Sequence, residues 1–288
     1  MSTELTIAND LGMSLAEAIG VSASGGETRS ASLPRVALMH NGIMGTIEVN
    51  GKSVKTEVVP AGSYKITLGE DKVVYSVNPT IRIFAVRQQW TKWDSEAEVM
   101  MKTVMSTDLK GDLKDNMGGF NLGRPSGYIE DFNALPEKTK GLIRSIKRKK
   151  IVFGMISAND VIDEGGNEMD SISDTPFVFE VSPSSIKSLD NAMSTLSRKN
   201  ILPIQYTFNL SAEEDKLPNG SSFSRIVFNA GDKVELQQDD QETLNNFLEY
   251  INYTNGKILT QWEEKNEEGI SSEDADIVAE FVNVEEAD

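Results

Sequence analysis

Two tryptophans lie three residues apart around a lysine, in the segment formed by Trp90, Thr91, Lys92 and Trp93. An indole ring can stack on an unpaired nucleobase, and an ammonium group can neutralise a phosphate. The same mixture of aromatic and cationic residues continues along the chain and forms a candidate surface for a single-stranded nucleic acid. The candidate residues are Arg87, Trp90, Lys92, Trp93, Lys102, Arg124, Tyr128, Arg144, Lys147, Arg148, Lys149 and Lys150. The alternative is that both tryptophans belong to a hydrophobic core and the lysines only solubilise the surface.

Charged residues are divided unevenly along the 288 residues, whose formal net charge is −17. Residues 1–150 hold 20 bases and 17 acids, whereas residues 151–288 hold eight bases and 28 acids. Seven bases and no acid fall within residues 138–150, and eleven acids and one base fall within residues 263–288. A basic run combined with an acidic terminus is typical of a nucleic-acid-binding surface with an acidic tail. Two solvated faces are the competing interpretation.

Several enzyme classes are excluded by composition. Cysteine is absent and His40 is the one histidine. Disulfides, thiolate nucleophiles and Cys-ligated metals are therefore excluded, and a Ser-His-Asp triad or a multi-His metal site nearly so. We predict no catalytic residue, no metal ligand and no cofactor.

Two segments resemble ligand-binding loops only superficially. The glycine-rich residues 118–127 lack the Lys-Ser/Thr pair that completes a P-loop, so they form either a structural loop or a close approach to a nucleic-acid backbone. The acidic loop that contains Asp160, Asp163 and Glu168 does not have the spacing of an EF-hand. A metal-dependent nuclease that uses these three carboxylates remains a minor alternative.

Strand patterns dominate the first half of the chain. Residues 34–89 consist of short β-rich runs separated by turn residues, including Asn-Gly at 41–42 and 50–51. This pattern predicts an antiparallel meander. Residues 90–150 are an irregular aromatic and basic segment, in which Pro136 opens a helix that extends through the basic run to Lys150.

Residues 151–262 show the order strand, strand, helix, strand, strand, helix. The helix in the middle of this order is compatible with the later part of an OB-type barrel. The predicted fold is therefore mainly β with a few helices (α+β), with an antiparallel meander plus an OB-like barrel over residues 34–262.

Both ends of the chain are predicted to lie outside this core. Residues 1–33 are rich in Ser, Gly, Ala and Thr and predict a flexible segment without the features of a signal peptide. Residues 263–288 are acidic and poor in aromatic residues, which predicts a disordered tail. No stretch has the length and apolarity of a membrane span, so we expect no membrane partner.

Together these features resemble a bacteriophage single-stranded DNA-binding protein. The resemblance is carried by the β-rich core, the interleaved aromatics and cations, the acidic tail, and the segment GGFNLGRPSGYIEDF that precedes the basic helix. It implies an OB fold, binding without sequence preference, and a non-enzymatic role in phage DNA replication or recombination in the cytoplasm of an infected bacterial cell. It also implies that the tail contacts a phage polymerase, helicase or primase. The tail residues to which it assigns this role are Glu273, Asp274, Asp276, Glu280, Phe281, Glu285, Glu286 and Asp288.

A virion or assembly protein is the main alternative function. Such a protein would form large, regular oligomers without DNA, and its basic residues would touch a packaged genome. The sequence leaves the oligomeric state open.

Overall fold

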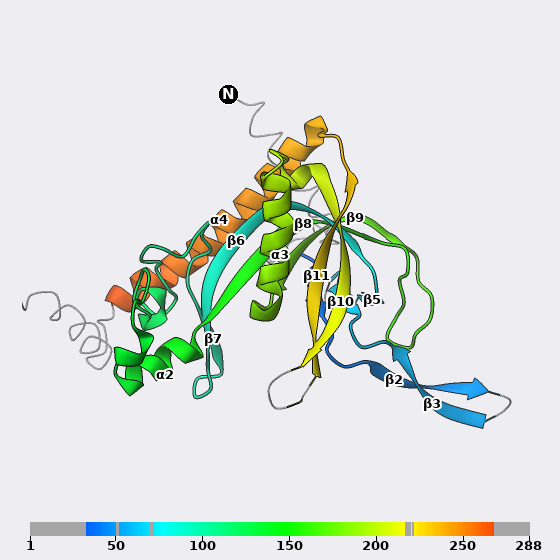
Figure 1. Ribbon diagram of the computed structural model, residues 1–288, viewed down its shortest axis with the longest axis horizontal. Helices are drawn as coiled ribbons and strands as arrows, with labels where there is room; N and C mark the ends of the chain where they lie inside the picture. Colours follow the sequence, from blue (N-terminus) through cyan, green and yellow to red (C-terminus); the bar gives the residue numbers. More distant parts are fainter. Residues whose placement is uncertain (1–32, 50–51, 70–71, 217–219, 221, 268–288) are drawn as a thin grey trace, which may run out of the picture. The chain divides into compact units, whose positions relative to one another are not determined.

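The structure is a computed structural model that describes residues 33–49, 52–69, 72–216, 220 and 222–267. Residues 1–32 of the predicted flexible segment and most of the predicted acidic tail lie outside the described residues, whereas Leu33, the last residue of the predicted flexible segment, is described and buried. The strands are β1 (Arg35–Leu38), β2 (Ile43–Val49), β3 (Lys52–Val59), β4 (Tyr64–Thr67), β5 (Val73–Ser76), β6 (Thr80–Asp94), β7 (Val99–Lys102), β8 (Lys147–Ala158), β9 (Ile172–Val181), β10 (Tyr206–Lys216) and β11 (Ser222–Lys233). The α-helices are α2 (Glu137–Ser145), α3 (Pro183–Ser197) and α4 (Gln238–Glu267). In the described part the strands β1 to β7 come first, and α2, the pair β8 and β9, α3, the pair β10 and β11, and α4 follow (Figure 1).

The main sheet is mixed and open. Its strand order is β11-β10-β6-β8-β9-β1-β4-β5, and β7 pairs with β6 beside this path. Most of the registered pairs are antiparallel, but β1 pairs with β9 in parallel, with Val36 opposite Phe179. The prediction of a mainly β protein with a few helices is confirmed. The described strands form a linear path and no closed barrel.

The predicted meander is correct in two hairpins and wrong in its overall connection. Strands β2 and β3 pair antiparallel, and so do β4 and β5. Strand β1 pairs with β4 and β9 instead of β2, because its buried Val36 belongs to the main sheet. The pair β2–β3 therefore forms a separate two-stranded sheet, and Asn41-Gly42 does not close a hairpin.

The second half of the chain follows the predicted order. Strands β8 and β9, helix α3, strands β10 and β11 and helix α4 succeed one another as expected. Helix α3 buries Ile186, Leu189 and Leu196, as its spacing predicts. Helix α4 continues to Glu267, so the first five residues of the predicted acidic tail are helical.

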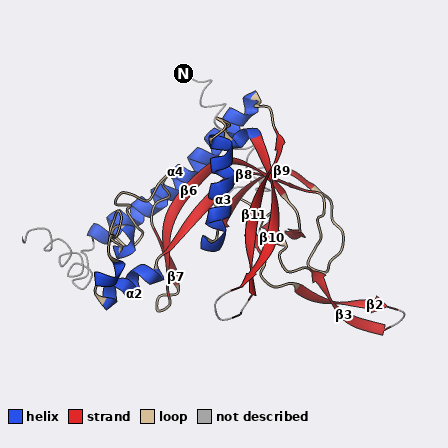
Figure 2. Ribbon diagram, in the orientation of Figure 1, coloured by secondary structure: helices blue, strands red, loops and turns tan. Residues whose placement is uncertain are grey.

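The basic run is divided between two kinds of structure (Figure 2). Helix α2 ends at Ser145, and residues 147–150 are the start of β8 rather than the end of a helix. Ile146 separates the two elements in an extended conformation and is buried. Burial of this side chain anchors the chain where the strand begins, which the helical prediction missed.

The contacts within the chain divide it into two compact units. Unit 1 comprises Met1–Phe84, Phe153–Glu180 and Lys187–Leu236, and unit 2 comprises Ala85–Val152, Val181–Ile186 and Gln237–Asp288. The aromatic core of unit 1 contains Tyr64, Phe153, Phe177, Phe179 and Phe208, all buried. At Gly154 a Cβ atom would lie 2.0 Å from the carbonyl oxygen of Arg82, so only glycine permits this approach of the two strands. No described helix is long and apolar enough to cross a membrane.

Candidate nucleic-acid interface

All twelve candidate binding residues lie in unit 2, between residues 85 and 152. Strand β6 positions the first four of them, because it runs without interruption to Asp94. Residues 90–94 are predicted from the sequence to be irregular, but they continue β6, and residues 91–94 pair antiparallel with β7. Both tryptophans of the Trp-Thr-Lys-Trp segment are therefore held on a strand.

Trp90 and Trp93 point to opposite faces of β6. Successive side chains alternate between the two faces of a strand, so residues three apart lie on different sides. Trp93 is opposite Met100 on β7, whereas Lys92, which lies on the same face as Trp90, is opposite the next residue, Met101. The two indole rings cannot form one continuous stacking platform.

One face of β6 gathers an aromatic ring and three cations, and we call it the Trp90 face. It consists of Gln88, Trp90 and Lys92 from β6, together with Arg124 and Arg148. The Arg124 guanidinium lies 4.6 Å from the centroid of the Trp90 ring. Arg148 donates two hydrogen bonds to Gln88 Oε1, at 3.1 Å from Nε and 2.7 Å from Nη2. Two cations that are remote in sequence are thereby fixed beside one strand.

Arg124 is held in place by its surroundings. Its Nη1 donates to the Pro125 carbonyl at 2.9 Å, and the ring of Trp90 lies under its guanidinium. Partial burial lowers the pKa of Arg124, but the group remains cationic at neutral pH. A positioned, partly desolvated guanidinium loses little conformational entropy when it meets a phosphate or a nucleobase.

The other face of β6 carries Arg87 and Trp93, and we call the group formed by Trp93, Met100 and Lys102 the Trp93 face. Lys102 belongs to it because it is the cross-strand partner of Thr91, which is two residues from Trp93. Trp93 is 56% exposed and Met100 is 41% exposed. An exposed tryptophan next to a lysine fits the chemistry predicted for this segment.

The remaining cations do not form a single basic surface. Along β8, Lys147 and Lys149 alternate with Arg148 and Lys150, so the four side chains divide between two faces. Lys147 Nζ donates to the carbonyl of Arg144 at 2.7 Å. The structure therefore assigns the basic run several local roles rather than one continuous contact.

Two further candidates lie in the segments between the strands. The Arg144 guanidinium is 5.4 Å from the centroid of the Phe132 ring. Tyr128 is 89% exposed in the segment that follows Arg124. Phe132 and Gln88 are missing from the sequence-based set, although Gln88 shares its strand parity with Trp90 and Lys92.

The first half of the glycine-rich segment is a structural loop built around a buried carboxylate. Asp115 is 1% exposed and accepts hydrogen bonds from the backbone N–H groups of Met117, Gly119 and Leu122 at 2.9–3.0 Å. At the end of α4, Trp262 Nε1 donates to the Gly119 carbonyl at 3.0 Å. These backbone groups are therefore used within the protein rather than presented to a ligand.

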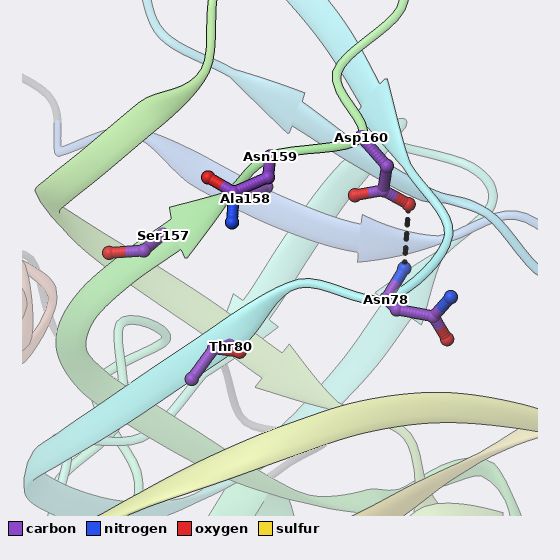
Figure 3. Close-up of a pocket in the computed structure, with 6 residues that line it drawn as sticks. All are labelled: Asn78, Thr80, Ser157, Ala158, Asn159 and Asp160. Atoms are coloured by element: carbon purple, nitrogen blue, oxygen red, sulfur yellow. Dashed lines mark hydrogen bonds between the residues drawn. The ribbon is translucent and has the colours of Figure 1, made fainter.

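The acidic loop uses its carboxylates to fix turns. Asp160 accepts a hydrogen bond from the N–H group of Asn78 at 3.2 Å (Figure 3), and it also accepts from the N–H group of Val77 at 2.9 Å and from the Ser76 hydroxyl. Asp163 accepts from the backbone N–H and the side chain of Asn167, which lowers the pKa of this carboxyl.

The hollow in Figure 3 has a volume of about 280 Å³. It is lined by Asn78, Thr80, Ser157, Ala158, Asn159 and Asp160. Both oxygens of its one carboxylate already accept hydrogen bonds. Within the described part of the chain, no group of three or more His, Cys, Asp or Glu side chains could hold a metal ion. The loop thus provides no observation in favour of a nuclease.

None of the protein families, curated proteins or solved structures compared with this chain matches it. Its function is therefore inferred from the Trp90 face, the Trp93 face and their surroundings.

Proposed function

We propose that the protein is a non-enzymatic single-stranded DNA-binding protein that acts in phage replication or recombination. The observation that carries the proposal is the Trp90 face, where the Arg124 guanidinium lies over a half-buried indole ring, Lys92 shares the strand face of Trp90, and Arg148 is hydrogen-bonded to Gln88. Guanidinium groups bind phosphates through paired donors, and aromatic rings and guanidinium planes stack on unpaired bases. Phosphate contacts and base stacking do not depend on the identity of the base, so we expect binding to be independent of sequence.

The distribution of charge supports the same conclusion. Residues 85–152 contain 13 basic and nine acidic residues, in a chain whose net charge is −17. The excess of cations coincides with the segment that carries two of the three tryptophans. Cations concentrated in one part of an acidic protein direct a polyanion to that part.

Two parts of the proposal depend on sequence alone. The acidic residues of segment 268–288 would contact a phage polymerase, helicase or primase, or another basic partner surface. An OB-like relationship is supported only by the order β8, β9, α3, β10 and β11, and DNA binding by the Trp90 face does not require a closed barrel.

Charge reversal on the Trp90 face tests the proposal. The double variant Arg124→Glu and Arg148→Glu should weaken binding of a labelled single strand by about 100-fold. It should also flatten the logarithmic salt dependence by about 1.4, since each lost phosphate contact on a single strand contributes about 0.7.

The matched control is Lys187→Glu with Lys199→Glu. It makes the same change in net charge at two exposed lysines of unit 1. If the control pair weakens binding as much as the Trp90-face pair, only overall charge matters and the proposed interface is wrong.

One observation favours the alternative of an assembly protein. Strands β2 and β3 form a separate sheet (Figure 1), in which Met44 is 63% and Val54 is 44% exposed. Met44 is opposite Glu57, and Val54 is three residues from Glu57, so the two side chains lie on opposite faces of the hairpin and a partner protein would contact it from both sides. Large, regular oligomers in sedimentation velocity without DNA would favour this alternative.

A further inference from the structure

The hairpin formed by β6 and β7 carries a tryptophan beside a cation on each of its faces. Trp90 has Lys92 and Arg124 on one side of the hairpin. On the other side, Trp93 and Lys102 are diagonal neighbours through the Thr91–Lys102 pair. Two sites with the same chemistry therefore lie back to back.

Near its turn this hairpin consists of β6 and β7, and Asn116 lines the outer edge of β7, where its N–H donates to the Lys102 carbonyl at 3.1 Å. Strand β8 begins at Lys147, whose carbonyl oxygen lies 3.4 Å from the Thr91 hydroxyl, so β6 extends past β8 beyond this point. On the outer side of β7, Asn116 Oδ1 accepts from the Lys102 N–H at 2.8 Å, and Asn116 Nδ2 donates to the Met100 carbonyl at 3.4 Å. A ligand at this edge therefore meets side chains rather than a free β-strand edge.

The turn of the hairpin is ordered by its own sequence. Asp94 Oδ1 accepts hydrogen bonds from the N–H groups of Glu96 at 2.9 Å and Ala97 at 3.1 Å. These bonds fix the end of β6 next to Trp93. The Trp93 side chain is exposed, but its backbone is held by the pairing with Met100. An exposed ring on a fixed strand can stack on a base at little entropic cost.

Charge at the hairpin defines where a polyanion can cross it. Asp94, Glu96 and Glu98 at the turn repel phosphates, whereas Lys92 and Lys102 lie farther from the turn on opposite faces. Lys92 is opposite Met101, the neighbour of Lys102, so the two cations are at nearly the same level of the hairpin. The favourable path therefore crosses the β7 edge at this level, over Asn116, and avoids the turn.

We propose that a single strand of DNA bends across the β7 edge of this hairpin. One base stacks on Trp93, and the phosphates on the other face meet Lys92 and Arg124. This inference rests on the proposed function and explains why the protein would bind a single strand more tightly than a duplex. A duplex, with a persistence length of about 50 nm, is too stiff to follow a path around two strands, so it reaches only one face.

The test compares Trp93→Ala with Tyr253→Ala. Tyr253 is the matched control because it is 54% exposed, nearly as much as Trp93, and lies on α4 of the same unit. Fluorescence anisotropy would measure the affinity of the full chain for a labelled thymidine strand of about 30 nucleotides and for a duplex of equal length. Trp93→Ala should bind the single strand about tenfold more weakly than the wild type, because it loses one stacking contact. The affinity of Trp93→Ala for the duplex, and both affinities of Tyr253→Ala, should equal those of the wild type.

A second measurement separates stacking from a change in fold. Adding the strand should quench the tryptophan fluorescence of the wild-type chain, and Trp93→Ala should lose most of this quenching. If Trp93→Ala binds the strand like the wild type, or loses strand and duplex affinity equally, the inference is wrong and the proposed function stands. If the wild-type chain does not bind the strand, both fail.

Discussion

Two antiparallel hairpins of this protein expose large apolar side chains but differ in chemistry. The β6–β7 hairpin exposes Trp93 and Met100 and has lysines on both faces. The β2–β3 hairpin, in a sheet of its own, exposes the aliphatic side chains of Met44 and Val54 and also Lys52 and Lys55, but its strands contain no aromatic residue. Because their secondary structure is the same, only the side chains indicate the ligand. Rings beside cations fit unpaired nucleic acid, and aliphatic side chains fit another protein.

The chain beside the β6–β7 hairpin is held in place by buried and partly buried polar groups. The segment that follows β7 is fixed by polar contacts within unit 2, since Asn255 accepts from the N–H of Met105 at 2.7 Å and donates to its carbonyl at 2.9 Å. Buried Asp115 organises the next loop. A binding surface that is ordered before its ligand arrives gains affinity because less entropy is lost.

The largest effect is expected from removing the carboxylate of Asp115, which holds the loop that follows β7. Asp115→Ala leaves three backbone N–H groups without their acceptor and should lower the free energy of unfolding by about 3 kcal/mol. Urea denaturation would measure this loss. Glu130→Ala, at an exposed carboxylate of the same unit, is the control. A loss no larger than that of the control would show that the loop does not depend on Asp115.

Removal of residues 268–288 should have the next largest effect. The segment contains eight acidic residues and no basic residue, so its removal reduces repulsion and competition at the cationic surface. We expect single-strand affinity at low salt to rise about tenfold, and binding to replication partners to weaken. The chain should end after Glu267, because Asn266 donates to the Gly118 carbonyl at 2.9 Å. Unchanged DNA and partner binding would contradict both roles of the tail.

Arg124→Lys sharpens the comparison because it preserves the charge of the Trp90 face. Lysine lacks the planar guanidinium that lies over Trp90, so affinity for a single strand should fall about fivefold. The salt dependence should not change, since the number of cations is the same. Titrations at several salt concentrations would measure both quantities. Equal affinities would mean that Arg124 contributes only its charge.

The smallest effect on DNA binding is expected at the other hairpin. Met44→Ser with Val54→Ser should leave single-strand affinity unchanged, because neither side chain belongs to the cationic and aromatic surface. Sedimentation velocity would show any role of the β2–β3 hairpin in self-association. A loss of DNA affinity without a change in self-association would contradict the division of roles between the hairpins.

Local pattern predicted most elements of the second half of the chain but not the long-range pairing. The spacing of Ile186, Leu189 and Leu196 predicts α3, since helix periodicity is local. The parallel pair of β1 with β9 joins residues that are more than 140 positions apart, and no turn signal indicates it. The helical prediction for the basic run failed because the burial of Ile146 is a tertiary effect.

The candidate site shows the same limit. The residue types predicted a group of aromatic and cationic side chains, and the structure places all of them in unit 2. Their division into two faces follows from strand parity, but only once β6 is known to continue to Asp94, which the sequence did not predict. The approach of Arg124 to Trp90 and of Arg148 to Gln88 depends on contacts between distant segments, which one sequence does not reveal.

The most direct test of the central claim is a competition titration with the full chain. Fluorescence anisotropy of a labelled single strand of about 30 nucleotides would be followed as protein is added, with unlabelled duplex of the same sequence as competitor. The proposed function predicts tight binding that weakens steeply with salt and that the duplex displaces poorly. No binding at low salt, either by the full chain or by a chain that ends at Glu267, would contradict it and favour the assembly protein.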